Sequence, residues 1–145
     1  MCGVAGIFSQ NPVASELYDS IVHLQHRGQD AAGIMTYDER MHKEKGLGLA
    51  KEIFNKENLH LLSGNIGISH NRYPTHGGFS HGEVQPFWTS VPYGIALAHN
   101  GNLTNYPELA KEVTKEETRY LNTTSDSEVL LHLFADHLHQ NIPPQ

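Results

Sequence analysis

The chain has 145 residues, of which 38% are hydrophobic and 18% are charged, with 13 glycines and 7 prolines. This composition is typical of one globular domain and excludes a fibrous or disordered chain. The formal net charge of -6, without a run of Lys and Arg interleaved with aromatic residues, argues against a nucleic-acid partner. The sequence contains neither a secretory signal nor the roughly 20 apolar residues of a membrane span. A single cysteine cannot form an internal disulfide, so nothing indicates an oxidising compartment. From these observations together we expect a cytoplasmic protein with no membrane partner.

The first half of the chain predicts strands and one helix. Small and apolar residues alternate from Cys2 to Phe8 and stop at a turn over residues 9–12, which predicts a buried first strand. From Val13 to about His26 the apolar residues have helical spacing, and Gly28 ends the pattern. The other expectations are a strand over residues 31–37, a weaker extended segment over 41–50, and an ambiguous stretch over 51–62.

The second half predicts two strands, a long loop and two helices. The strands cover residues 65–70 and 95–99, and each runs directly into polar residues. The segment NRYPTHGGFSHGEVQPFWTS lies between them, and this length with so many Gly and Pro residues is typical of a lid. Residues 105–115 predict a helix, and a stronger helix starts at Ser125, where Ser-Asp-Ser-Glu has the spacing of a capping box.

Cys2 can supply both a nucleophile and a base. If Met1 is removed, Cys2 carries a thiol with a pKa of about 8.5 and an α-amino group with a pKa of about 7.7 to 8.0. The amine can then accept the proton that the thiol loses, which is the chemistry of N-terminal nucleophiles. A small buried hydrophobic residue that happens to be cysteine explains the position equally well. Other residues must therefore distinguish between these two interpretations of Cys2.

Three polar residues and one glycine could complete such a site. A strand ending in Asn100-Gly101 can direct a side-chain amide and a backbone N–H at one oxyanion, although Asn-Gly is also a strong turn signal. Arg72, at the end of its strand, can bind a carboxylate. Asp126, in the first turn of its helix, can bind an ammonium, so the pair suits the zwitterion of an amino acid. A surface or interdomain ion pair for Arg72 and simple helix-dipole stabilisation by Asp126 are the alternatives.

The eleven histidines predict no metal site. His70, His76 and His81 are close in sequence, but their spacings of six and five residues match no common zinc motif. The chain has no second cysteine to complete a mixed Cys and His site. We therefore expect surface or loop histidines, with His99 as a core histidine whose hydrogen bonds are satisfied.

Taken together, these residues resemble the class II glutamine amidotransferase domain, of the N-terminal-nucleophile hydrolase type. The segments QHRGQD, RYP and TSDSE resemble the purine-pathway amidophosphoribosyltransferase branch more than the aminosugar synthase branch. The resemblance implies an α+β fold of four layers, αββα, present incompletely in this chain. The segments that carry it are MCGVAGI, LQHRGQDAAGI, HNRYPTHG, VQPF, LAHNGNLTN and NTTSDSEVLL.

The resemblance also implies a role for each site residue. Cys2 would attack the carboxamide of L-glutamine, while Asn100 and the Gly101 N–H hold the oxyanion. Arg72 would bind the α-carboxylate of glutamine and Asp126 its α-ammonium. The further residues expected to line the substrate site are Arg27, Gly28, Thr75, His76 and Gly77, the last three in a closing loop.

The resemblance covers the whole chain but only the first part of the family protein. We therefore expect residues 1–145 to be the N-terminal part of a glutaminase domain, without cofactor. A phosphoribosyltransferase domain, absent here, would use the ammonia and magnesium to convert phosphoribosyl pyrophosphate to phosphoribosylamine, the first committed step of purine synthesis, in a homo-oligomer. Two alternatives remain: the glutaminase portion of an aminosugar-phosphate synthase, and a truncated fragment that only mediates association.

Overall fold

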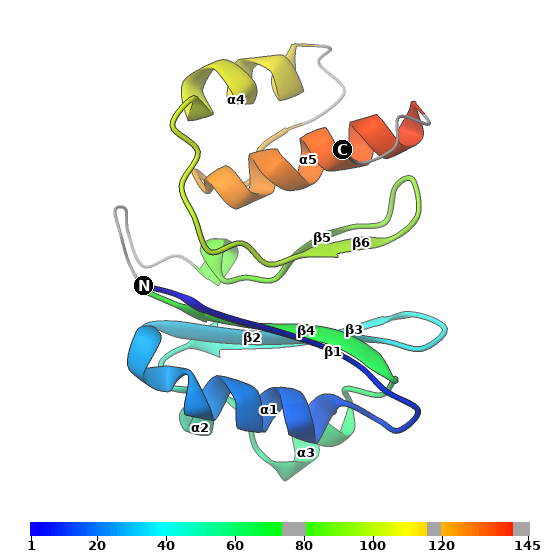
Figure 1. Cartoon of the computed structure of the whole chain (residues 1–145). Coiled ribbons are helices and arrows are strands. Elements are labelled where there is room, and N and C mark those ends of the chain that lie inside the picture. Colours follow the sequence, from blue (N-terminus) through cyan, green and yellow to red (C-terminus); the bar gives the residue numbers. More distant parts are fainter. Residues whose placement is uncertain (74–80, 116–119, 141–145) are drawn as a thin grey trace.

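The chain folds into four stacked layers in the computed structural model, which describes residues 1–73, 81–115 and 120–140. Helices α1 to α3 form one outer layer and α4 and α5 the other, and two antiparallel β-sheets lie between them (Figure 1). The predicted αββα architecture is therefore confirmed. No helix within these described ranges is long and apolar enough to cross a membrane.

The larger sheet has four antiparallel strands in the order β1-β4-β2-β3. Its central strand β2 is buried over six of its seven residues, as the apolar sequence AAGIMTY requires. The prediction that the first strand is buried is wrong, because β1 is an edge strand whose Val4 and Phe8 are 40% and 79% exposed. The strands are β1 (Gly3–Phe8), β2 (Ala31–Tyr37), β3 (Met41–Leu47) and β4 (Ile66–Arg72).

One face of this sheet packs on α1 (Ala14–His23), which buries Leu17 and Ile21 completely against Ile34 of β2. Apolar burial of this kind is the main favourable term in folding, at roughly 25 cal/mol per Å². The predicted helix therefore forms, with its last turn replaced by the short 3-10 helix η1 (Gln25–Arg27). The ambiguous stretch becomes two short helices, α2 (Ala50–Ile53) and α3 (Lys56–His60).

The second sheet is smaller and lies under α5. Its strands β5 (Phe87–Thr89) and β6 (Ile95–Leu97) have three residues each. β5 was not predicted, because three residues within a Gly- and Pro-rich segment show no measurable alternation. The sheet is covered by α5 (Asp126–His139), which packs on both strands, and α4 (Tyr106–Thr114) packs on α5 (Figure 1).

The capping of α5 differs from the prediction. Ser125 is the N-cap and its hydroxyl accepts a hydrogen bond from the Ser127 N–H, at 3.3 Å. Glu128 does not close a capping box. Its carboxylate instead accepts hydrogen bonds from the backbone and side chains of Asn122 and Thr123, at 2.7 to 2.9 Å. Burial alone would raise the pKa of Glu128, but these four hydrogen bonds outweigh it and lower the pKa.

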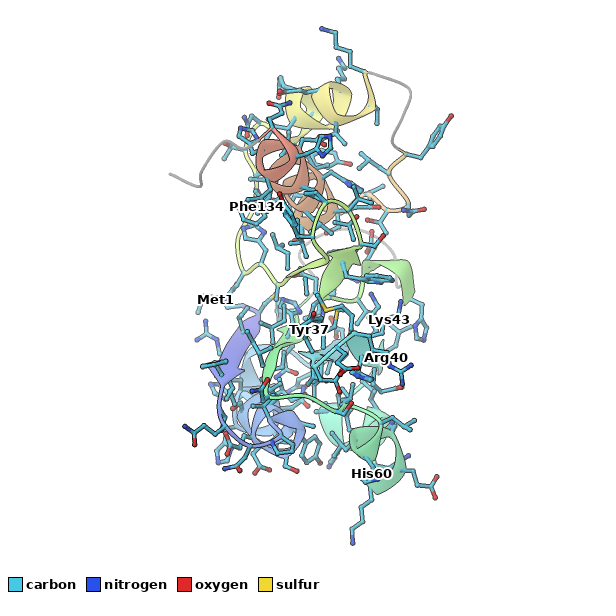
Figure 2. The ribbon with its side chains drawn as sticks, turned by 90° about the vertical axis from the view of Figure 1, so that its right-hand side faces the viewer. Met1, Tyr37, Arg40, Lys43, His60 and Phe134 are labelled. Carbon is cyan, nitrogen blue, oxygen red and sulfur yellow. The ribbon has the colours of Figure 1, made fainter. Side chains whose placement is uncertain are left out.

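Two lysines of β3 contact β5 and the segment that precedes it. Lys45 donates hydrogen bonds to the carbonyl oxygens of Val84 and Pro86, at 2.6 and 3.4 Å. Lys43 lies over the Trp88 ring of β5 at 4.6 Å, and Figure 2 shows it at the level where the two halves meet. The long lysine side chains thus span the space between the two sheets, which the apolar residues of the larger sheet do not fill completely.

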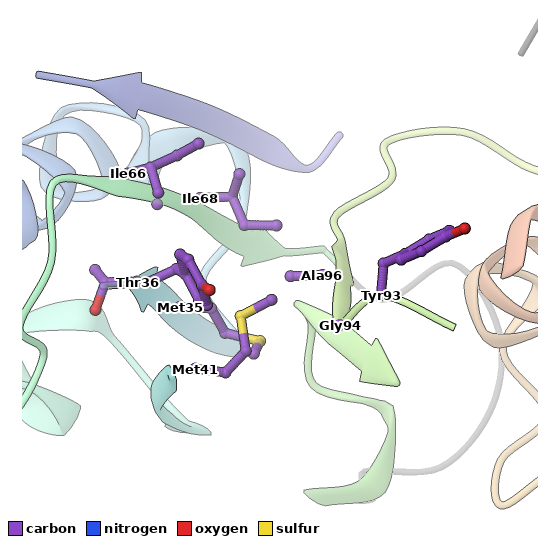
Figure 3. A pocket seen from close by; sticks show the side chains of 10 residues that line it. Met35, Thr36, Met41, Ile66, Ile68, Tyr93, Gly94 and Ala96 are labelled. Carbon is purple, nitrogen blue, oxygen red and sulfur yellow. The ribbon is translucent and has the colours of Figure 1, made fainter. Parts of the chain in front are cut away.

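An apolar cavity of about 350 Å³ occupies part of this gap. It lies between the larger sheet and the segment that connects β5 to β6, and Figure 3 shows Met35, Met41, Ile66 and Ile68 on the side of the larger sheet and Ala96 across from them. Because its lining offers few polar groups, this cavity is a packing feature and has no chemistry-bearing cluster. Its principal lining residues are Met35, Tyr37, Met41, Ile66, Ile68 and Tyr93.

Candidate active site

A second, polar cavity of about 740 Å³ opens where β1 begins and β4 ends. Its lining includes all five residues that were expected to act directly on a substrate: Cys2, Arg72, Asn100, Gly101 and Asp126. These residues come from the position just before β1, from the end of β4, from the segment after β6 and from the first turn of α5. The fold therefore brings together residues that are up to 124 positions apart in the sequence.

Cys2 is held at the mouth of this cavity through both its backbone and its sulfur. The Tyr73 N–H donates to Cys2 Sγ at 3.3 Å. The Cys2 carbonyl accepts from Arg27 Nε at 3.0 Å and from Asn100 Nδ2 at 2.8 Å. The thiol is free of any disulfide and partly exposed. Met1 is 75% exposed and lies at the junction of the two halves (Figure 2), where an aminopeptidase can reach it.

Asn100 and Gly101 lie in the segment after β6, which ends at Leu97. The Asn100 amide has two N–H donors, and its contact with the Cys2 carbonyl uses one of them. The second can be offered to an oxygen beside Cys2. A side chain at position 101 would place its Cβ 2.5 Å from His99 Nε2, so only glycine fits without moving that ring. The Asn-Gly pair therefore satisfies a steric requirement as well as a possible catalytic one.

Asp126 is fixed by a network that extends beneath the Asn-Gly segment. Its carboxylate accepts from the Leu103 N–H at 2.9 Å and from the Ser127 hydroxyl at 3.2 Å. Gln85 donates to the same hydroxyl at 3.1 Å and accepts from the His99 N–H at 2.7 Å. Buried networks of this kind hold their members in one arrangement when every group is paired.

Gln85 and Ser127 were not identified from the sequence as site residues. They are 8% and 1% exposed, so their polar atoms are buried and must be paired within the protein. The only sequence signal for Gln85 is a lone polar side chain in the apolar run VQPF. Ser127 was visible only as part of the expected cap of α5. Neither signal distinguishes a network beneath a site from an ordinary surface position.

Arg72 forms an ion pair with Glu83, a partner that was not identified from the sequence. Its Nη2 donates to Glu83 Oε2 at 2.6 Å, and Thr124 donates to Glu83 Oε1 at 2.9 Å. The alternative reading of Arg72 as a member of an ion pair is thus correct, but the pair lies inside the polar cavity and not on the surface. Arg72 keeps a position from which it can bind a ligand's carboxylate.

The other predicted lining residues are placed differently. Arg27 supports the Cys2 carbonyl from outside the cavity. Gly28 packs against β4, and a Cβ there would lie 2.6 Å from the Arg72 carbonyl carbon. Both residues therefore position other groups. Thr75, His76 and Gly77, expected in a closing loop, lie outside the described residues.

The histidines considered for a metal are not gathered in one place. His70 is fully buried in β4, whereas His81 is exposed, and His76 lies outside the described residues. Burial is the main cause that lowers the pKa of His70 to about 4; a polar interaction with the His99 backbone opposes it, and the charges of Arg72 and His99 add to it. His99 is hydrogen-bonded as expected, with Nδ1 3.3 Å from the Ser127 hydroxyl, but its side chain stays 23% exposed. Among residues 1–73, 81–115 and 120–140, no group of three or more His, Cys, Asp or Glu could hold a metal.

Relatives of known name match most of this chain. Amidophosphoribosyltransferases from Pseudomonas aeruginosa and Escherichia coli are each 51% identical to it over 139 and 140 residues. The enzyme of that name from Saccharomyces cerevisiae is 47% identical over 146 residues. The alignments cover 95 to 97% of this chain but only 28 to 29% of those relatives. The chain thus spans less than a third of the length of the curated relatives that it matches.

Solved structures and a family model give the same assignment. Glutamine phosphoribosylpyrophosphate amidotransferase from B. subtilis, solved with ADP and GMP, superposes with a TM-score of 0.80 at 36% identity. A structure described as the allosteric regulatory enzyme of purine biosynthesis gives 0.81 at 38% identity. Each match covers 92% of this chain and 29% of the solved one. The family model described as glutamine amidotransferase domain matches residues 70–144, which is just over half of the chain. The chain therefore belongs to the glutamine amidotransferase domain family.

Proposed function

We propose that this chain hydrolyses glutamine to release ammonia, as the N-terminal part of an amidophosphoribosyltransferase. The observation that carries the proposal is the convergence of a thiol, an amide donor, a guanidinium and a carboxylate on one cavity, from Cys2, Asn100, Arg72 and Asp126. Together they supply a nucleophile, an oxyanion donor and two charges that complement an amino acid. The family assignment of residues 70–144 supports glutamine as the substrate class.

The reaction begins after Met1 is removed. The free α-amine of Cys2 accepts the thiol proton, and the thiolate attacks the carboxamide carbon of glutamine. The oxygen becomes an oxyanion, which the second N–H of Asn100 and the backbone N–H of Gly101 stabilise. Ammonia leaves with the proton from the Cys2 ammonium, and a γ-glutamyl thioester remains. Water then cleaves the thioester to give glutamate and the free thiol.

Substrate recognition divides between the two sides of the cavity. Arg72 offers its guanidinium to the α-carboxylate of glutamine, and Asp126 offers its carboxylate to the α-ammonium. The two hydrogen bonds from Leu103 and Ser127 fix the orientation of the Asp126 carboxylate. A substrate held at both groups presents its carboxamide to Cys2 in a fixed direction, which removes much of the entropic cost of the attack.

The fate of the ammonia is proposed from the relatives. They are named amidophosphoribosyltransferases, so the full-length protein would transfer the ammonia to phosphoribosyl pyrophosphate, giving phosphoribosylamine and pyrophosphate. An aminosugar-phosphate synthase is disfavoured, since the relatives from Pseudomonas aeruginosa, Escherichia coli and Saccharomyces cerevisiae are all named amidophosphoribosyltransferase. The lone thiol and the absence of any disulfide agree with a cytoplasmic location.

The proposal is tested by measuring glutamate and ammonia release by the purified chain, with an intact mass of the same sample. We expect release from protein that has lost Met1, and none above background from Cys2→Ala. Protein that retains Met1 should also be inactive, because its Cys2 nitrogen is an amide and cannot accept the proton. A folded, Met1-free chain that releases nothing would support the alternative of a fragment that only mediates association.

A further inference from the structure

We propose that Glu83 is a positioning residue that sets the orientation of Arg72 and its spacing from Asp126, and so determines selectivity for α-amino acids. This inference rests on the proposed function of the cavity. Glu83 ends the short 3-10 helix η2 (His81–Glu83), lines the same cavity as Cys2, and is 9% exposed. A carboxylate buried in this cavity must be paired with other polar groups, because burial of an unpaired charge has a large free-energy cost.

The two oxygens of Glu83 bind two different parts of the molecule. Oε2 accepts from Arg72 Nη2 at 2.6 Å, a charge-assisted hydrogen bond at the end of β4. Oε1 accepts from the Thr124 hydroxyl at 2.9 Å, in the segment that leads into α5. The Arg72 and Glu83 side chains are only 15% and 10% exposed, so solvent screens the pair weakly.

These contacts connect the two ends of the recognition site. Thr124 lies two residues before Asp126, the proposed ammonium ligand, and Arg72 is the proposed carboxylate ligand. In every α-amino acid the carboxylate and the ammonium are attached to the same carbon, so their separation is fixed. A site that recognises both groups must hold its own two charges at a matching distance. Glu83 is the side chain that bridges the elements carrying them.

The contact also leaves Arg72 able to bind a substrate. A guanidinium has five N–H donors, and the hydrogen bond to Glu83 uses Nη2. Holding one corner of this planar group restricts its rotation, so the remaining donors point in a defined direction and lose less entropy on binding a carboxylate. A purely structural ion pair between layers would make the same contact but would have no effect specific to α-amino acids.

The test compares Glu83→Gln with the matched control Glu16→Gln, an exposed position in α1 on the far layer. Two electrophiles report on Cys2 by intact mass. One is a glutamine analogue with a diazoketone in place of the carboxamide, which carries both α-groups. The other is iodoacetamide, which carries neither. We expect Glu83→Gln to slow labelling by the analogue by about tenfold, the size of one charge-assisted hydrogen bond. Labelling by iodoacetamide should change less than twofold, and the control should match wild type with both reagents.

A second variant keeps the inference falsifiable if Glu83→Gln does not fold. Thr124→Val removes only the hydrogen bond to Oε1, and we expect it to slow the analogue by about threefold while sparing iodoacetamide. Where glutamine turnover can be measured, both variants should raise KM with little change in kcat.

The outcomes separate this inference from the proposed function. Equal labelling of wild type and Glu83→Gln by the analogue would overturn the role of Glu83 alone. Equal slowing with both reagents would also overturn it, because Glu83 would then only support the fold around Cys2. Wild type, freed of Met1, that reacts with iodoacetamide but not with the analogue would overturn the glutamine site itself.

Discussion

The two cavities lie at opposite ends of β4, and only the one at the end of the strand is lined by charged side chains. Ile66 and Ile68 line the apolar cavity at the start of the strand, whereas Arg72 lines the polar one at its end. The seven residues of β4, Ile-Gly-Ile-Ser-His-Asn-Arg, thus change from packing residues to functional ones along one strand. The same backbone ladder to β1 and β2 supports both ends.

The ends also differ in how they are assembled. The apolar cavity is formed largely by neighbours in the β2-β3 hairpin and β4, together with the β5-β6 turn. The polar cavity depends on contacts between distant segments, such as Asn100 with Cys2 and Thr124 with Glu83. Changes at the apolar end should therefore affect stability, and changes at the polar end should affect rate and affinity for glutamine.

The largest effect should come from Asn100→Ala. Loss of one oxyanion donor lowers kcat by roughly 10² to 10³-fold, because that hydrogen bond strengthens only as charge develops on the oxygen. KM for glutamine should change little, since Arg72 and Asp126 are intact. Glutamate release measures both quantities. Asn65→Ala, an exposed asparagine just before β4, is the matched control and should behave as wild type. A kcat loss below threefold for Asn100→Ala would argue against the oxyanion role.

At the apolar end, Met35→Ala should destabilise the fold by about 2 to 4 kcal/mol, through lost burial and a larger cavity. Met35 is 1% exposed and lines the apolar cavity (Figure 3). Met41 lines the same cavity but is only partly buried, so Met41→Ala should cost less than half as much. Urea unfolding measures both losses. If Met35→Ala also raised KM for glutamine at a temperature where it is folded, the two ends would not be independent.

Asp126→Asn should raise KM for glutamine by about 10-fold, because the neutral amide cannot pair with the α-ammonium. The Oδ1 of asparagine can still accept the hydrogen bond from the Leu103 N–H, and its Nδ2 can donate to the Ser127 hydroxyl, so the helix start should keep its shape. Initial rates over a range of glutamine concentrations give the change. Asp19→Asn, exposed in α1, controls for the loss of one negative charge. An unchanged KM would leave Asp126 with only its role at the helix terminus.

Much of the fold was predictable because strong local patterns decided it. Strand β2 was predicted with its observed bounds, and Ser125 was correctly identified as the start of α5. The local patterns failed for features that depend on tertiary contacts. Burial of β1 depends on its place at the sheet edge, and the partners of Glu128 depend on how the segment before α5 folds back. Neither property is encoded in spacing.

The candidate site divides in the same way. Cys2, Asn100 and Asp126 were identifiable because their chemistry follows from a position at a chain or element terminus. Glu83 and Gln85 were not, because a buried polar residue looks like any other until its partners are known. The roles of all these residues remain predictions, but the structure supplies the geometry that makes each one testable.

His70 lies on β4 between the two ends, and its effect on stability should be small and dependent on pH. Side chains alternate along a strand, so His70 faces the second sheet as Ile68 does, and it is fully buried. Burial lowers the pKa of this imidazole to about 4, compared with about 6.5 in an unfolded chain. The folded state therefore favours the neutral ring.

The sign of the pH effect follows from which state binds more protons. Between the two pKa values the unfolded chain protonates His70 while the folded chain does not, so stability falls as pH falls through this window. Well above pH 6.5 the ring is neutral in both states, so it no longer makes the stability depend on pH. We expect wild type to lose about 1 kcal/mol more than His70→Gln between pH 6 and pH 5, by urea unfolding. His81→Gln changes an exposed histidine and should keep the wild-type slope. Equal slopes for wild type and His70→Gln would mean that folding does not lower the pKa of this ring, and that the polar end extends further along β4 than its lining residues indicate.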